Sequence, residues 1–271
     1  MAEYTKIPWT DHTFNPWWGC EKVSPGCKNC YAEGQAARYG HKCWGHDTEC
    51  RTMSEGHWRK PMKWDRWCKE MGLRHKVFVG SMCDVMEDRR DLDRFRERLW
   101  DLIEATPSLD WLLLTKRPEN YTLLLPERWL SGCPRNVWIG TTVEEQDVAE
   151  ERVDAIAPIR AVVHFLSIEP MLGPVNIGLL GTTPKDWGYG YRMVGEIINW
   201  VIVGAESGSK RRPYDPNWGR AVRDECVDAG VPFFYKQEIL PNGKKVETPP
   251  LDGKVWTQSP SDEEFVSNAY M

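Results

Sequence analysis

The sequence lacks several features that would directly assign it to a class of proteins, such as membrane, secreted or strongly charged proteins. No apolar run approaches the roughly 20 residues that cross a bilayer, and no apolar signal core follows Met1–Lys6. We therefore expect no membrane segment, no export and a cytoplasmic location. A strong net charge is also missing, since 35 Lys and Arg residues against 40 Asp and Glu residues give −5. Overall charge gives no argument for a nucleic-acid partner, although a local basic groove would be enough to bind one.

Internal repeats, low-complexity tracts and long linkers are absent too. The nine cysteines are an odd number, and without a sign of secretion they argue against a disulfide framework. In a reducing compartment, clustered cysteines more often bind metal or take part in chemistry. The 271 residues are enough for one α/β barrel of ordinary size.

Short apolar runs with β-branched residues recur along the chain, which is typical of strands buried on both faces. The six runs are 76–80, 111–115, 136–140, 161–166, 200–204 and 231–235. Helical patterns lie between them at 91–104, 144–156 and 218–229. This alternation predicts an α/β fold with mostly parallel strands, in a full or partial (β/α) barrel, and an open doubly wound sheet is the alternative. We assign residues 1–240 to the barrel, with 40–60 as an inserted loop or lid, and residues 241–271 to a C-terminal tail.

Polar side chains follow each of the first five predicted strands. They include Ser81, Asp84, Lys116, Thr142, Glu144, Glu169 and Glu206. Because the carboxyl ends of barrel strands form one rim, we expect a single polar site built from all five strands. For each residue the alternative is a helix cap or a solvated loop charge.

Three cysteines near the N-terminus form the pattern C-x6-C-x2-C, at Cys20, Cys27 and Cys30. Thiolates are soft ligands that suit both iron–sulfur clusters and zinc. Three protein thiolates leave one iron of a cuboidal cluster open to a substrate or cofactor. A structural zinc site needs a fourth ligand, which His12, Cys43 or Cys50 would supply. The spacing alone does not decide between the two metals.

The residues around the cysteines carry a resemblance. The string from Asn15 to Cys20, followed by Cys27-Lys28-Asn29-Cys30-Tyr31-Ala32, resembles the cluster loop of radical SAM proteins related to spore photoproduct lyase. Its first cysteine gap is three residues longer than the usual radical SAM spacing. The chain from about Thr5 to Gln237 resembles a phage-associated family of radical-SAM-like proteins. The matching strings are 77–84, 112–118, 137–144, 166–174, 201–212 and 233–237.

The resemblance implies a partial barrel of the radical SAM type and a 4Fe–4S cluster held by the three cysteines. The open iron would bind S-adenosylmethionine (SAM), and an electron from the cluster would cleave it to a 5′-deoxyadenosyl radical that abstracts hydrogen from a substrate. By strand order, the resemblance places Ser81 and Asp84 at the SAM amino group, and Lys116 or Arg117 at the SAM carboxylate. It places Thr142 and Glu144 at the ribose of SAM. Glu169 and Glu206 would contact SAM or the substrate.

The resemblance also implies an external electron donor of the flavodoxin or ferredoxin type. Our first hypothesis is a radical SAM enzyme that modifies, isomerises or repairs a nucleic-acid base or nucleotide, in DNA for example. The second is a radical SAM enzyme for a small metabolite or peptide. The third is a zinc-stabilised binding module without catalysis. The basic run 206–213, with Lys236 and Gln237, is either an anion site or a solvated charge run.

Overall fold

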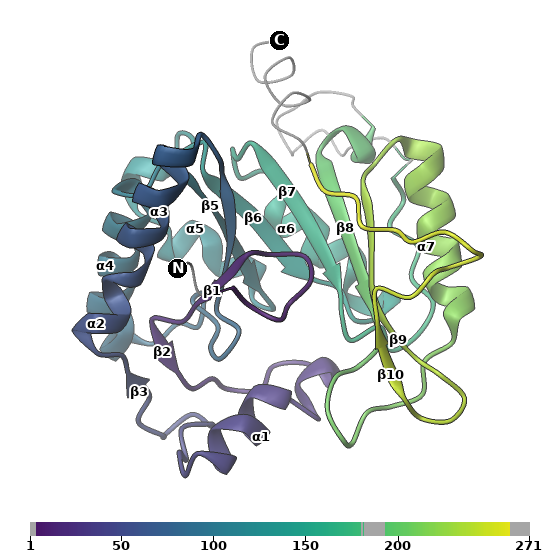
Figure 1. Cartoon of the computed structure of the whole chain (residues 1–271), viewed down its shortest axis with the longest axis horizontal. Coiled ribbons are helices and arrows are strands. Elements are labelled where there is room, and N and C mark those ends of the chain that lie inside the picture. Colours follow the sequence, from purple (N-terminus) through teal and green to yellow (C-terminus); the bar gives the residue numbers. More distant parts are fainter. Residues whose placement is uncertain (1–3, 180, 182–192, 261–271) are drawn as a thin grey trace.

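A curved, eight-stranded sheet organises the part of the chain that the computed structural model describes, which is residues 4–179, 181 and 193–260 (Figure 1). The strands follow the order β1-β4-β5-β6-β7-β8-β9-β10, and of these pairings only β9–β10 is antiparallel. They are β1 (His12–Phe14), β4 (His75–Val79), β5 (Leu109–Thr115), β6 (Val137–Thr142), β7 (Val163–Ile168), β8 (Ile198–Gly204), β9 (Phe233–Ile239) and β10 (Lys245–Glu247). Each of the six predicted runs overlaps a strand, because strands buried on both faces require continuous apolar sequence.

Helices cover the outer face of this sheet. They are α2 (Glu55–Trp58), α3 (Lys60–Met71), α4 (Asp93–Glu104), α5 (Tyr121–Leu124), α6 (Ala149–Ile156) and α7 (Pro216–Ala229), and a further helix, α1 (Tyr31–Arg38), follows the cysteine motif. Their apolar side chains form one large core with outward-facing strand residues such as Val77, Trp111 and Val201. None of the helices in these ranges is both long and apolar enough to cross a membrane.

The predicted helices exist, but two of them have different starts. The pattern at 144–156 becomes helical only at Ala149, after an extended stretch and a short 3-10 turn at Gln146–Val148. The pattern at 218–229 begins earlier, at Pro216, because the Asp215 side chain accepts a hydrogen bond from the backbone N–H of Asn217. Proline at the first helical turn and an aspartate before it are a common helix start.

The inner face of the sheet changes character along the strands. Away from the strand ends that carry the predicted polar residues, it bears a second, smaller core that includes Trp9, Trp138, Phe165 and Trp200. No helix of the described residues contributes to this core. Gly140 belongs to this layer, since the Phe165 ring occupies the space where a β-carbon at Gly140 would lie. Within the described residues, the helices that pack on the sheet therefore lie on its outer face, which makes the doubly wound alternative wrong. The predicted α/β half-barrel with mostly parallel strands is confirmed.

Two segments outside the predicted strands add to the fold. Within 40–60, β3 (Arg51–Thr52) pairs with β2 (Trp17–Trp18), so this insertion is attached to the cysteine loop. In the predicted tail, β10 extends the sheet and the Trp256 carbonyl accepts a hydrogen bond from the Tyr235 N–H. Residues 241–260 are thus part of the folded half-barrel, and the rest of the predicted tail, 261–271, lies outside the described residues.

Candidate active site

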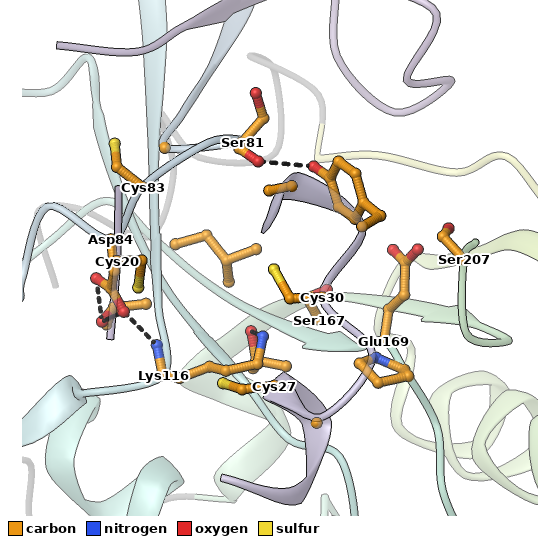
Figure 2. A pocket seen from close by; sticks show the side chains of 18 of the residues that line it. Cys20, Cys27, Cys30, Ser81, Cys83, Asp84, Lys116, Ser167, Glu169 and Ser207 are labelled. Carbon is orange, nitrogen blue, oxygen red and sulfur yellow. Dashed lines mark hydrogen bonds between the residues drawn. The ribbon is translucent and has the colours of Figure 1, made fainter. Parts of the chain in front are cut away.

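A pocket opens at the carboxyl ends of the parallel strands, next to the smaller inner core that contains Trp9 and Phe78. Its lining includes Cys20, Cys27 and Cys30 together with seven of the eight residues predicted to contact SAM or substrate, which are Ser81, Asp84, Lys116, Arg117, Thr142, Glu169 and Glu206. Figure 2 shows Asp84 and Lys116 on the side of Cys20, and Glu169 and Ser207 on the opposite side. The structure therefore brings the cysteine loop and the strand ends, which are far apart in the sequence, to one place.

The three cysteines come from one loop that wraps over this pocket. Cys27 ends a 3-10 turn at Pro25–Cys27, and Cys30 lies directly before helix α1. All three thiols are free and half-buried. Burial raises the pKa of the Cys20 thiol, and the charges of Asp84 and Glu87 raise it further. Arg117 opposes this shift, because it donates a hydrogen bond to Cys20 Sγ at 3.8 Å and its positive charge favours the thiolate.

Asp84 and Arg117 form the buried support beneath Cys20. Arg117 Nη1 lies 3.1 Å from Asp84 Oδ2, and less than a tenth of either side chain is exposed. Arg117 Nη2 also donates to the Glu21 carbonyl at 2.8 Å, which ties the cysteine loop to β5. Asp84 accepts further hydrogen bonds from Thr115 Oγ1 and from the backbone N–H of Lys116. Asp84 lines the pocket as predicted, but its carboxylate is already engaged by the protein.

Glu144 does not line the pocket. It lies behind the cysteine loop, where Oε1 accepts from Ser24 Oγ at 2.5 Å and Oε2 lies 2.5 Å from Arg152 Nη1. Ser24 Oγ in turn lies 3.7 Å from Cys27 Sγ. Its carboxylate is buried and engaged by Ser24 and Arg152, and the contact with the SAM ribose stays a prediction from the resemblance. Glu144 positions the segment that carries Cys27.

Glu206 holds the same loop from the β8 side. Its Oε1 lies 2.5 Å from Arg212 Nη2, and its Oε2 accepts from Asn29 Nδ2 at 3.2 Å. Arg212 Nη1 also donates to the Pro25 carbonyl at 3.0 Å. Burial raises the pKa of Glu206, but the hydrogen bonds from Arg212 and Asn29 outweigh this effect and lower it. Glu206 is therefore an ionised anchor at the pocket wall.

The remaining pocket residues differ in how much of their bonding capacity is used. Glu169 is paired with Lys236 at 2.5 Å, and Ser81 Oγ accepts a hydrogen bond from Asn15 Nδ2. Lys116 Nζ has only a weak contact with Thr142 Oγ1 at 3.4 Å, and in the described ranges no carboxylate pairs with it. Lys116 is thus a cation of the pocket that is available to an anionic ligand.

The chain matches one protein family over most of its length. Residues 4–260 match the family described as "Protein of unknown function (DUF5131)". The chain belongs to the DUF5131 family. This match includes every pocket residue named above. A search of curated proteins found no match for the DUF5131 chain.

Two solved structures of spore photoproduct lyase are similar to the DUF5131 chain, each at 12% sequence identity. One is a mutant with bound AdoMet and dinucleoside spore photoproduct, with a TM-score of 0.47 over 90% of this chain and 70% of the lyase chain. The other is a complex with dinucleoside spore photoproduct, with a TM-score of 0.48 over 97% of this chain and 72% of the lyase chain.

Three contributors to the site were not predicted from the sequence of this DUF5131 chain. Asn29 and Tyr31 flank Cys30, and Tyr31 Oη donates to the Ser81 carbonyl at 2.9 Å. Their position inside the cysteine motif was a usable signal. Arg152 on α6 pairs with Glu144, but nothing in the local sequence distinguishes it from a solvent-exposed helical arginine.

The packing of Glu144 against the loop makes Gly26 sensitive to substitution. A β-carbon at Gly26 would lie 2.4 Å from Glu144 Oε1, and the carboxylate cannot move away without losing Ser24 and Arg152. We expect Gly26→Ala to lower the free energy of unfolding by about 1–3 kcal/mol, as overpacking does. Urea unfolding followed by tryptophan fluorescence measures this.

The matched control is Gly34→Ala in helix α1, where the added methyl group meets open space. It should be neutral or stabilise the protein by up to about 1 kcal/mol, because alanine is the better helix former. Equal effects of the two substitutions would contradict the close packing of Gly26 on Glu144.

Proposed function

We propose that this protein is a radical SAM enzyme whose 4Fe–4S cluster is held by Cys20, Cys27 and Cys30. The observation that carries the proposal is that these three free thiols share one pocket with the ammonium group of Lys116, which pairs with no carboxylate of the described residues. When bound, the cluster would supply the electron that cleaves SAM to methionine and a 5′-deoxyadenosyl radical.

Three thiols on one loop are a donor set that suits an iron–sulfur cluster, because such clusters are held by cysteine thiolates. In the part of the chain that the structure describes, no group of three or more His, Cys, Asp or Glu side chains is arranged to hold one metal ion. A cuboidal cluster binds each thiolate through a different iron, so its ligands need not converge on one point. The fourth zinc ligands considered from the sequence, His12, Cys43 and Cys50, are all buried and none lines the pocket.

The pocket residues have distinct tasks in this proposal. Lys116 binds the carboxylate of SAM, because it is a cation without a protein carboxylate. Thr142 and Ser81 offer hydroxyl groups to the polar parts of SAM. Asp84 acts indirectly, by holding Arg117 beside Cys20 and by fixing the backbone of Lys116. Glu144 is left out of the contacts to SAM.

The substrate side of the pocket is the wall formed by Glu169, Lys236 and Ser207. A nucleic-acid base or nucleotide is the substrate that we propose. The apolar lining from Trp9, Phe78 and Leu114 supports this, since a base presents flat apolar faces and polar edges. The electron donor of flavodoxin or ferredoxin type, the cytoplasmic location and the association with phages stay predictions from the sequence.

Anaerobic reconstitution with iron and sulfide tests the proposal. We expect about four iron atoms per chain, a brown protein, and 5′-deoxyadenosine when SAM and dithionite are added. One tightly bound zinc per chain and no response to SAM would instead favour the zinc-stabilised binding module. A cluster that forms but never cleaves SAM would contradict the enzymatic part of the proposal.

A further inference from the structure

Three segments bring four exposed or half-exposed cations together beside the pocket. The cations are Lys28, Lys210, Arg211 and Lys244, and we call them the basic ridge. Side-chain hydrogen bonds to backbone carbonyls connect the segments, because Asn29 Nδ2 donates to the Lys210 carbonyl at 2.8 Å and Arg211 Nη2 donates to the Gly243 carbonyl. The basic ridge is thus assembled by the fold from the cysteine loop, the loop after β8 and the β9–β10 turn.

The charges of the basic ridge are not neutralised by the protein. No carboxylate within the described residues pairs with any of the four side chains. The nearby acids have other cations, since Glu206 is paired with Arg212, Glu169 with Lys236, and Glu247 with Lys245 at 2.8 Å. On a chain with a net charge of −5, an unpaired group of cations is a local exception that favours an anionic ligand.

The basic ridge borders the substrate side of the pocket. Asn29, Glu206 and Ser207, which are neighbours of ridge residues in the chain, line the pocket themselves. Figure 2 places Ser207 beside Glu169 on the side away from Asp84. A ligand bound on the ridge can therefore place an attached group into the pocket.

We propose that the basic ridge binds the phosphates of a nucleic-acid strand, one base of which enters the pocket. This inference rests on the proposed function and specifies its substrate as a strand rather than a free nucleotide. Four cations from three segments offer more than one phosphate site, whereas a nucleoside monophosphate carries a single phosphate. An enzyme that acts on a base needs that base outside the stack, and an unpaired strand meets this need.

Salt-dependent binding of an oligonucleotide tests the inference on the reconstituted full chain. Fluorescence anisotropy with labelled single strands of about 12 nucleotides, as DNA and as RNA, is followed between about 50 and 200 mM salt. With three or four phosphate contacts, the logarithm of the affinity should fall with the logarithm of salt with a slope of about −2 to −3. The DNA and RNA arms show which sugar the strand carries.

The test variant is Lys210→Ala/Lys244→Ala, and its matched control is Lys63→Ala/Lys69→Ala. The control removes two exposed lysines from helix α3, which packs on the outer face against β5. The ridge variant should bind at least about 10-fold more weakly at low salt and reduce the slope by about 1.4, which is 0.7 for each lost contact. The control should leave both quantities unchanged.

Three outcomes overturn the inference: no binding of either strand, equal effects of the ridge variant and the control, or a nucleoside monophosphate that displaces the strand at equal phosphate concentration. Iron content and SAM cleavage without substrate are measured on the same preparations. If iron content and SAM cleavage are normal while strands fail to bind, the inference of a nucleic-acid strand is wrong and the proposed function stands. If the iron is absent, the proposed function fails independently of the binding result.

Discussion

The variant Cys20→Ala/Cys27→Ala/Cys30→Ala should fall from about four iron atoms per reconstituted chain to nearly none, because no other thiol lines the pocket except Cys83. Production of 5′-deoxyadenosine from SAM should be lost with the iron. The fold should survive, since all three side chains are half-buried and belong neither to the large outer core nor to the smaller inner core of the sheet. Iron analysis, the visible spectrum and circular dichroism measure the three expectations.

Cys133→Ala is the matched control for this experiment. Cys133 is also a free, half-buried thiol, but it is not among the pocket residues. It should keep the full iron content and SAM cleavage. A triple variant that still retains the iron, or a control that loses it, would show that the metal is bound elsewhere.

Arg117→Met should be among the most destabilising single substitutions near the site. It leaves the buried carboxylate of Asp84 without its cation, and breaking a buried pair in this way costs about 3–5 kcal/mol. It also removes the hydrogen bond to the Glu21 carbonyl and the cation beside Cys20. We therefore expect a loss of unfolding free energy in urea and a second effect, slower or incomplete iron loading at Cys20.

Two further variants separate these effects. Arg128→Met removes an exposed arginine from its pairs with Asp101 and Glu104, and it should change stability little because water screens such pairs. Arg117→Met/Asp84→Asn removes the uncompensated charge, so it should regain part of the stability but not the contact with Cys20. A double variant less stable than Arg117→Met would contradict the charge explanation.

The strands were predictable from the sequence because burial of a strand requires apolar residues along its whole length. Six of them are buried on both faces, so each needs an uninterrupted apolar run. β1 was not predicted, since its three residues include the polar His12 and Thr13 and are too few to show a pattern. It exists because the edge of β4 offers parallel backbone partners, which is a tertiary cause.

The site was predictable to the extent that it follows strand ends. Thr142 is the last residue of β6, Lys116 and Glu169 directly follow β5 and β7, and all three line the pocket. Glu144 follows the same rule in sequence but not in space. Its partner Ser24 is 120 residues away, and no local pattern reports such a contact. The same holds for Arg212, whose contact with the Pro25 carbonyl spans 187 residues.

That last separation has a consequence for the order of events during biosynthesis. Ribosomes add about 5–20 residues each second, so the segment that clamps Pro25 emerges about 10–40 s after the cysteines. Through this interval the nascent thiols are exposed to oxidants and to competing ions. For the cluster that we propose, we therefore expect delivery of iron and sulfide to succeed after the C-terminal third has been made, by a carrier that acts on the folded chain.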